Sequence, residues 1–493
     1  MKSFLKSGFI IVKTNLVSRF LNMFSLGLLS RILSLQNFGL YNIYINTGNS
    51  INQIAELGIT IPTQQKIAKC KNENKEELGN FLGSIIILVL IITILVTFIL
   101  IYFESYIFKI LLKNNYNKNI NNIIIFIISF EYLNVFLTSI LFGFGNFTNI
   151  LKKNILSNLT LLILIIPMAF FYDFIYVFYA YSLYSFITLI YSTYLIRREI
   201  ILYNIKISLN DFFFHVNNLF KNGFLYYIGS TLLGSLTGLL TISLFSKYVN
   251  IVDFSNFRIA SAIIALINFF PIGLASITIS YLSQTDKYES IKLKFFQFRY
   301  IIFFTLFISI ILYIFLVPFV NLLFGIQYLN GINYITYLIF LNFFTQTSTI
   351  VNNFLISSNK NNFVGLTSIL HSIVILITLK FFISNYGFNG YLLINFCCII
   401  SILFIQIFKE FKTTDYQSDQ LRIIYFLILS FIITIILFII MNLNFNKIIL
   451  YFLNIFVVFL YSIFFYKYFV TTTEKSKLLF KLNTFSYKKF RIN

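Results

Sequence analysis

Apolar residues run along this chain in long blocks separated by short polar segments. Fourteen blocks are about 18 residues or longer, enough for a helix to cross the roughly 30 Å hydrocarbon core of a bilayer. The alternating segments of about ten residues that are typical of membrane β-barrels are missing from the sequence. The pattern predicts an all-α, polytopic membrane protein with about 14 transmembrane helices. The expected spans are 8–31, 39–61, 81–103, 120–143, 154–172, 174–196, 223–246, 254–282, 299–320, 332–356, 363–383, 388–408, 423–442 and 447–469.

Local signals refine these spans. Only Asp173 is left for the turn between 154–172 and 174–196, which predicts a very short connection. Pro167, Pro271 and Pro318 lie inside expected spans and predict kinks or helix ends, because proline cannot donate a helical hydrogen bond. The first block lacks a short hydrophobic region followed by an A-x-A-like site, so we expect no cleavable signal peptide and a first helix that stays.

Charge is scarce and unevenly placed. Only 11% of the 493 residues are charged and 58% are hydrophobic, whereas soluble domains carry about 25% charged residues. If the N-terminus is cytoplasmic, the inner segments hold 27 of the 37 basic residues and the outer segments hold 7. This bias predicts that both termini lie in the cytoplasm, and it accounts for the net charge of +21 without nucleic acid. The basic tail from Lys475 to Arg491 is expected to touch anionic lipid weakly.

A weak internal repeat suggests two halves. Residues 29–42 and 245–258 align at an offset of 216, which pairs Arg31 with Lys247 and Phe38 with Phe254. Six spans separate the first from the seventh, so the two units have the same orientation in the membrane. We therefore expect two parallel six-helix lobes with cargo between them, and two additional helices. The expected domains are 1–205, 206–412 and 413–493, the last including a basic cytoplasmic tail.

Basic residues inside the first span are the main functional signal. Arg19 lies about 11 residues into its helix, roughly 16 Å deep, which is too deep for easy snorkelling. Lys13 is nearer the cytoplasmic end and could snorkel. Arg19 and Lys13 are therefore candidates for binding an anionic cargo. The alternative is an ion pair that holds helices together, for instance between Arg19 and Glu56. Arg258, near the start of the eighth span, is a third candidate for substrate binding, with interfacial anchoring as the alternative.

Acidic and polar residues give weaker candidates. Glu131 lies near the midplane, where a carboxyl group is either protonated or paired, so it could bind a coupling Na+ or H+ or serve as structure. Glu56 could pair with a basic residue or face water. His371 is more often an interhelical hydrogen-bonding residue than a relay. Polar runs such as 43–53, 229–241 and 342–353 could line a cavity or join helices.

No motif supports catalysis. The sequence contains no phosphate-binding loop, HExxH, nucleophile elbow or metal-ligand spacing, and no large outer loop for polymerase or glycosyltransferase chemistry. We predict no catalytic residues, no metal site and no cofactor. A coupling ion, Na+ or H+, is the one exception. The three cysteines, Cys70, Cys397 and Cys398, are expected to be structural.

The stretch Ser30-Arg31-Ile32-Leu33 followed by Asn37-Phe38-Gly39-Leu40-Tyr41 resembles the opening "aRlLs…dfGlY" of the Wzx-type polysaccharide flippases. Leu323-Phe324-Gly325 resembles the "lfG" of their second lobe. These exporters belong to the multidrug/oligosaccharidyl-lipid/polysaccharide superfamily. The resemblance implies ion-coupled alternating access that flips a polyprenyl-pyrophosphate-linked oligosaccharide, an O-antigen or capsule unit, across the bacterial inner membrane. Polysaccharide polymerase and chain-length proteins are the partners that it implies.

The related lipid II flippases offer an alternative. By position, Lys13, Arg19 and Arg258 resemble their cationic cavity residues, and Glu56 resembles their second-helix carboxylate. Those relatives carry an Arg-Asp pair in helix one, whereas Arg19 is followed by Phe20 here, which favours a different cargo. Fourteen spans instead of twelve favour lipid II. A multidrug cation exporter of the same superfamily would need acidic cavities, which the basic first span disfavours.

Overall fold

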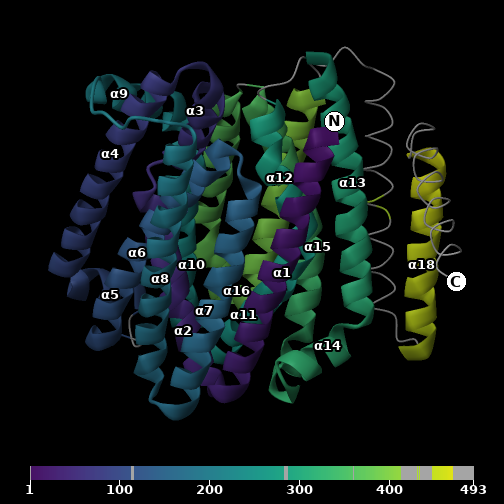
Figure 1. Cartoon of the computed structure of the whole chain (residues 1–493). Coiled ribbons are helices and arrows are strands. Elements are labelled where there is room, and N and C mark those ends of the chain that lie inside the picture. The colour runs from purple at the N-terminus through teal and green to yellow at the C-terminus, as the bar shows by residue number, and fades with distance from the viewer. Residues whose placement is uncertain are drawn as a thin grey trace, which may run out of the picture.

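The structure is a computed structural model that describes residues 2–112, 116–282, 287–358, 360–411, 430, 432 and 447–469. All described secondary structure is helical (Figure 1). The first half contains α1 (Lys2–Ile32), α2 (Leu35–Ala55), α3 (Thr60–Glu73), α4 (Lys75–Tyr102), α5 (Glu104–Leu112), α6 (Lys118–Phe144), α7 (Phe147–Phe171) and α8 (Phe174–Leu202).

The second half follows a short linker. It contains α9 (Phe212–Tyr226), the π-helix η2 (Tyr227–Leu233), α10 (Gly234–Tyr248), α11 (Ile251–Ile267), α12 (Phe269–Leu282), α13 (Lys287–Ile314), α14 (Leu316–Leu323), the 3-10 helix η3 (Ile326–Gly331), α15 (Ile332–Ser357), α16 (Asn361–Phe411) and α18 (Lys447–Tyr468). The expected span 423–442 and the tail from Lys475 lie outside the described residues, except for positions 430 and 432.

Seven described helical segments are long and apolar enough to cross a membrane, which agrees with a polytopic membrane protein. They are Lys75–Tyr102, Lys118–Phe144, Phe147–Phe171, Phe174–Leu202, Tyr227–Tyr248, Leu293–Ile314 and Asn361–Glu410. These seven contain eight expected spans, because α16 is two helices joined at Gly387, whose backbone (φ 56°, ψ −134°) is not helical. Several other spans fall on helices that are broken or rich in polar residues, such as the asparagine-rich α2.

Three expected spans are each broken in two. The span 254–282 consists of α11 and α12, which meet at Asn268, three residues before Pro271. Proline has no N–H for the carbonyl four residues back, so the break follows from the sequence. The span 299–320 ends at Ile314, four residues before Pro318, and α14 follows. The span 39–61 breaks between α2 and α3, where Leu57 and Gly58 both have positive φ. Pro167, in contrast, lies inside an unbroken α7.

Asparagines begin many of these helices. The side chains of Asn74, Asn117, Asn146 and Asn250 each accept a hydrogen bond from a backbone N–H in the first turn of the next helix. Such N-caps satisfy donors that the helix leaves unpaired. The turn expected at Asp173 is confirmed, since α7 ends at Phe171 and α8 begins at Phe174.

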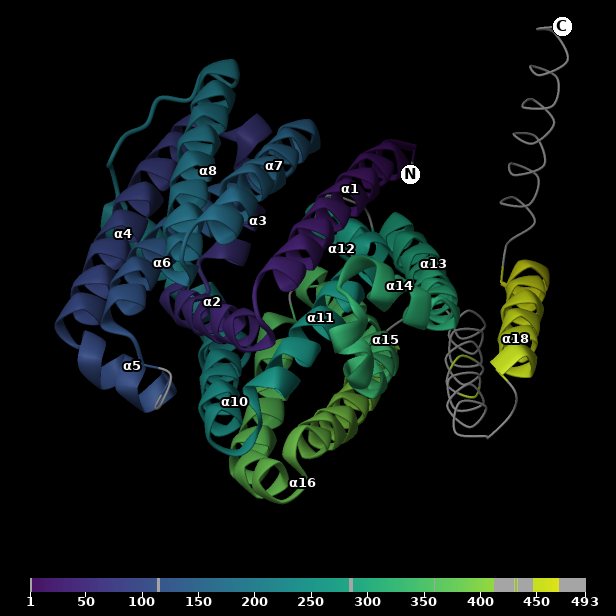
Figure 2. The ribbon, with the colours of Figure 1, turned by 90° about the horizontal axis from the view of Figure 1, so that it is seen from below.

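The helices pack as two groups (Figure 2). We call α2 to α8 the N-group and α10 to α16 the C-group. Between them α1 packs against α7 on one side and α12 on the other, while α2 packs against α10 and α11. We call this contact zone the seam. The face at which α1 begins, with α3 and α9, is named the N-face, and the opposite one the far face (Figure 1).

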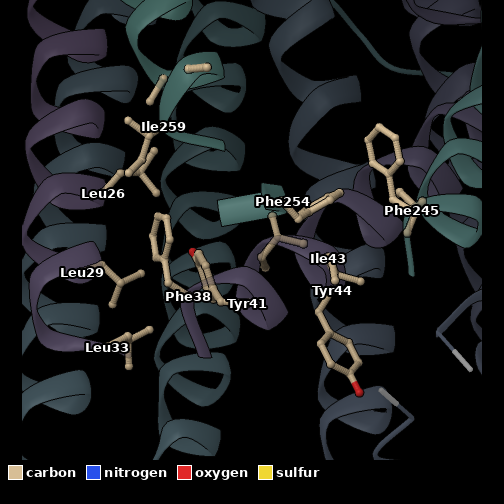
Figure 3. Close-up of a cluster of buried hydrophobic side chains, with 14 of the residues drawn as sticks. Leu26, Leu29, Leu33, Phe38, Tyr41, Ile43, Tyr44, Phe245, Phe254 and Ile259 are labelled. Atoms are coloured by element: carbon tan, nitrogen blue, oxygen red, sulfur yellow. The ribbon is translucent and has the colours of Figure 1, made fainter. Parts of the chain in front are cut away.

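The seam is closely packed toward both faces. Toward the far face, apolar side chains of α1, α2 and α11 form one buried cluster, including Leu29, Phe38 and Phe254 (Figure 3). At its centre, a Cβ on Gly39 would lie 2.5 Å from Ile251 Cγ2, so only glycine permits this approach. Toward the N-face, Gly273 of α12 lies against Val12 of α1. The C-group therefore contacts α2 toward the far face and α1 toward the N-face.

Candidate functional site

A cavity of about 410 Å³ lies in the seam. Its walls come from α2 of the N-group and from α10, α11 and α16 of the C-group. Cavities of about 300–1,000 Å³ are typical of small-molecule sites. We call it the seam cavity.

The walls combine amides with aromatic rings. Asn46, Asn49 and Gln53 follow one another at intervals of three and four residues, so they form a polar stripe on one face of α2. Opposite this stripe, the C-group supplies aromatic side chains, among them Phe257 and Tyr391, whose rings pack edge to face at 6.1 Å. Amides exchange hydrogen bonds with hydroxyl groups, and aromatic faces cover apolar ring surfaces. The cavity is therefore suited to a polar ligand with apolar faces.

Arg258 and His371 line the same cavity. Arg258 Nε and His371 Nε2 are buried polar atoms without a hydrogen-bond partner among the described residues. A buried, unpaired donor is costly, so such atoms mark places that water or a ligand fills. Arg258 thus lines the cavity, and its role in substrate binding stays a prediction. His371 was expected to be a satisfied hydrogen-bonding residue, and that expectation is wrong for Nε2.

Arg19 lies in the seam outside the cavity wall. Its Nη1 donates a 2.8 Å hydrogen bond to the carbonyl oxygen of Ala265, across from α1 to the last turn of α11. A cation is favourable there because the helix dipole leaves partial negative charge at the C-terminus. The break at Asn268 creates that helix end. No described ion pair joins Arg19 to Glu56, and Arg19 joins helices through the carbonyl of Ala265 instead.

Lys13 and Glu56 stand apart from the seam cavity. Lys13 is exposed, on the half of α1 nearer the N-face. Glu56 follows α2 directly, at the break, and is partly buried. Its charge acts on Tyr132 of α6, and no described basic residue pairs with it.

Glu131 lies inside the N-group. Its Oε1 accepts a 2.6 Å hydrogen bond from Ser185 of α8. Nearby, Lys153 of α7 donates to Thr138 and to the carbonyl of Asn134 at 3.4 Å. Lys153 precedes the expected span 154–172, but α7 begins six residues before it and its side chain is only 8% exposed.

Polar runs in the sequence gave part of this arrangement. Runs 43–53 and 229–241 do line the seam cavity. In contrast, Asn342 of the run 342–353 pairs reciprocally with Asn268 at 2.8 and 2.9 Å and so joins helices. Arg31 donates hydrogen bonds to the carbonyls of residues 321–323 at the end of α14 and so joins α1 to the C-group near the far face.

Solved structures similar to this chain share its fold. "Lipid II flippase MurJ, inward closed conformation" is 17% identical with a TM-score of 0.68, and the match covers 95% of this chain and 99% of that chain. "Outward-facing conformation of a multidrug resistance MATE family transporter of the MOP superfamily" is 16% identical with a TM-score of 0.64, covering 83% and 97%. "Crystal structure of MATE in the straight conformation" is 15% identical with a TM-score of 0.63, covering 83% and 96%.

Sequence comparison agrees with this placement. Residues 4–219 match the family described as "Polysaccharide biosynthesis protein", whereas no curated protein matches. The chain therefore has the all-helical, multi-pass membrane fold that these solved structures share. The match of residues 4–219 to that family agrees with the resemblance inferred from sequence.

Proposed function

We propose that this protein flips a polyprenyl-pyrophosphate-linked oligosaccharide, an O-antigen or capsule unit, across the bacterial inner membrane by alternating access. The observation that carries the proposal is a series of cations along the seam, because the pyrophosphate of such a cargo is a compact anion. The family match supports a glycan as its other half.

The series follows from helix geometry. Arg19 lies six residues after Lys13 on α1, about 9 Å farther from the N-face at 1.5 Å per residue. Arg19 contacts Ala265, which lies seven residues after Arg258 on α11. Seven residues are about 10 Å and nearly two complete turns, so Arg258 lies on the same side of α11, closer to the far face. Lys13, Arg19 and Arg258 thus offer positive charge at successive depths to an anion that moves through the seam.

The seam cavity would receive the sugar. The amide stripe of α2 would bind hydroxyl groups, and the aromatic wall of the C-group would cover a sugar ring. Arg258 and His371 would take an acidic group at the cavity wall. One cavity built by both groups matches alternating access, because separation of the groups at either face would expose it.

For topology, we propose two parallel six-helix lobes, 1–205 and 206–412, with 413–493 adding two helices and a basic tail. The bias of 27 inner against 7 outer basic residues makes the N-face cytoplasmic, with both termini inside. Glu56 and Glu131 remain the candidates for ion coupling or ion pairing. Polysaccharide polymerase and chain-length proteins are the proposed partners.

Lipid II is the second candidate cargo. The MurJ match covers 95% of this chain, against 83% for the outward-facing multidrug transporter. A structural match over most of the chain favours lipid II as the cargo. The lack of an acidic residue after Arg19 argues against lipid II.

A mutation in the producing strain tests the proposal. Arg19→Ala and Arg258→Ala should each abolish surface polysaccharide while the protein is still inserted at normal level. Lys247→Ala, an exposed lysine at the end of α10, is the matched control and should leave polysaccharide unchanged. Normal polysaccharide with both arginines removed would overturn the proposal. Loss of cell-wall synthesis in place of surface polysaccharide would indicate lipid II.

A further inference from the structure

The N-group contains a lysine and a carboxylate that the seam cavity does not use. Glu131 of α6 and Lys153 of α7 interact electrostatically, and each is held by neutral partners. Ser185 donates to Glu131, while Lys153 donates to Thr138 and to the main chain of Asn134. Asn134 and Thr138 follow Glu131 by three and seven residues, so Lys153 reaches the face of α6 that carries the carboxylate.

Neutral hydrogen bonds fix the frame around them. Asn134 donates 3.0 Å bonds to the carbonyl of Ser185 and to Thr188 Oγ1, and it accepts from Ser192. These contacts join α6 to α8 and hold Ser185 against Glu131. Glu131 is half-buried, whereas Lys153 is buried.

Tyrosines connect this pair to the seam. The titratable groups that face Glu131 are Lys153 from α7 and two tyrosines from α8, Tyr181 and Tyr184. The Tyr181 ring lies 6.5 Å from that of Tyr41 on α2, and the charge of Arg258 acts on both rings. These two tyrosine rings therefore form a path of side-chain contacts between Glu131 and the side of the seam that carries Arg258.

The other helices packed against α6 keep their ionisable groups elsewhere. Glu56 at the end of α2 acts on Tyr132. Lys66 and Lys71 of α3 are bonded to Glu77 and to the carbonyl of Phe144 at the N-face. On α5, Glu104 accepts from Tyr116 and Asn121 near the far face. α4 contributes no described charged residue beyond its first turn.

We propose that Glu131 and Lys153 form the proton-binding site that couples this transporter to the proton gradient, and that the site excludes Na+. The inference rests on the proposed function for its cargo. In the reaction, Glu131 carboxylate takes one proton from water and becomes a carboxylic acid, while Lys153 stays an ammonium. A sodium ion at Glu131 would instead face that ammonium, and like charges repel. The carboxylate already has its counter-charge, so only a proton adds to it without displacing Lys153.

Protonation would also change the seam. Neutral Glu131 leaves the buried Lys153 without a counter-charge, and an uncompensated buried ion is strongly unfavourable. The N-group arrangement seen here then loses stability relative to one that hydrates Lys153. Because the tyrosine path ends at Arg258, the added positive charge would be felt where the cargo anion binds.

Two measurements on the full-length protein test the site. The first is infrared difference spectroscopy of detergent-solubilised protein between acidic and alkaline buffer, without cargo. A carboxylic acid C=O band should appear on acidification and be lost in Glu131→Gln. The second is movement of a fluorescent polyprenyl-pyrophosphate disaccharide across liposomes, with and without a pH gradient. Glu131→Gln should keep exchange without a gradient and lose the acceleration by the gradient, about tenfold or more.

The double variant Glu131→Gln/Lys153→Met separates coupling from structure. This variant removes both charges, so neither is left buried without its counter-charge. If the pair is purely structural, gradient-driven transport should return in this variant. That result would overturn the proposal. Acceleration of the wild type by a sodium gradient alone would also overturn it. Glu104→Gln is the matched control, a buried carboxylate with no lysine partner among the described residues, and should keep the proton response. If even the wild type fails to move the probe, the cargo assignment is wrong. The infrared band, present in the wild type and absent in Glu131→Gln, then tests by itself whether Glu131 binds a proton.

Discussion

Glu199 and Glu410 occupy corresponding places in the two helix groups. Glu199 is 1% exposed at the end of α8, and its Oε1 accepts from the side chains of Asn146 and Asn149 at 2.7 and 2.6 Å. Glu410 is 2% exposed at the end of α16, where it accepts from Lys294 at 2.7 Å and pairs with Lys360 at 3.5 Å. In both groups the carboxylate holds a turn between two long helices.

A lysine completes each of these two clusters. Lys71 donates to the carbonyl of Phe144 at the end of α6, and Lys294 donates to the carbonyl of Phe354 near the end of α15. The chemistry of the two turns differs, because asparagine side chains donate to Glu199 whereas lysine side chains pair with Glu410. Equivalent contacts of this kind support the proposed two-lobe repeat, although the sequence around them shows little identity.

We expect the two glutamates to differ in their effect on stability. Glu410→Gln leaves the ammonium of Lys294, only 13% exposed, without its carboxylate and should cost about 2 kcal/mol. Glu199→Gln replaces charge-assisted bonds to amides by neutral ones and should cost about 1 kcal/mol. Thermal unfolding of the purified variants, followed by exposure of the buried Cys70, measures both. Equal stability of Glu410→Gln and the wild type would contradict the role of the ion pair.

Gly39 should control closure of the seam toward the far face. Gly39→Ala places a Cβ 2.5 Å from Ile251 Cγ2 and 2.8 Å from Ser255 Oγ, so α2 and α11 must separate. The variant should favour the state in which the far face is open, and a cysteine at Ser255 should become several times more reactive toward a thiol reagent. Gly234→Ala is the matched control, because nothing lies within 4 Å of its Cβ position. An unchanged rate in Gly39→Ala would show that the helices separate anyway.

His371 should matter because of the cavity that it lines. His371→Phe removes a polar atom and fills space between the amide stripe and the C-group, so transport of the probe should fall about tenfold or more. The neighbouring Leu370→Phe changes a side chain that is 56% exposed on the other side of α16 and should have little effect. Transport rates in liposomes measure both. Loss of activity in the control alone would place the important surface outside the cavity.

The hydrophobic pattern of the sequence predicted where most helices lie, but it did not predict which side chains contact one another across helices. Apolar block length, the turn at Asp173 and the prolines Pro271 and Pro318 predicted helices and several of their ends, because these are local properties. Arg19 and Ala265 are 246 residues apart, and the bond joins a side chain to a main-chain oxygen that no residue pattern marks. The expected span 154–172 also left out Lys153, whose burial depends on contacts with Asn134 and Thr138 of another helix. The positions of helices along the chain were thus predictable, whereas the direction of each side chain depended on packing.

The docking of α9, the helix that follows the linker, against α4 should depend on pH through His215. This side chain is 5% exposed, and its ring lies 5.8 Å from that of Phe81 on α4 in an edge-to-face contact. Burial, with Lys66 as a second cause, lowers the pKa of His215 below its ordinary value of 6.5. Undocked α9 then binds more protons than docked α9, so docking is stable above the ordinary pKa and is weakened as pH falls below it.

Limited proteolysis of the linker at residues 203–211 measures this docking. We expect cleavage to increase as pH falls from about 7 to about 5.5, where an unperturbed histidine becomes charged. His215→Phe keeps a ring against Phe81 and removes the titrating group, so its cleavage should no longer depend on pH. His215→Ala loses the ring contact and should be cleaved faster at every pH. A wild-type cleavage rate that stays constant across this pH range would show that α9 remains docked with His215 charged.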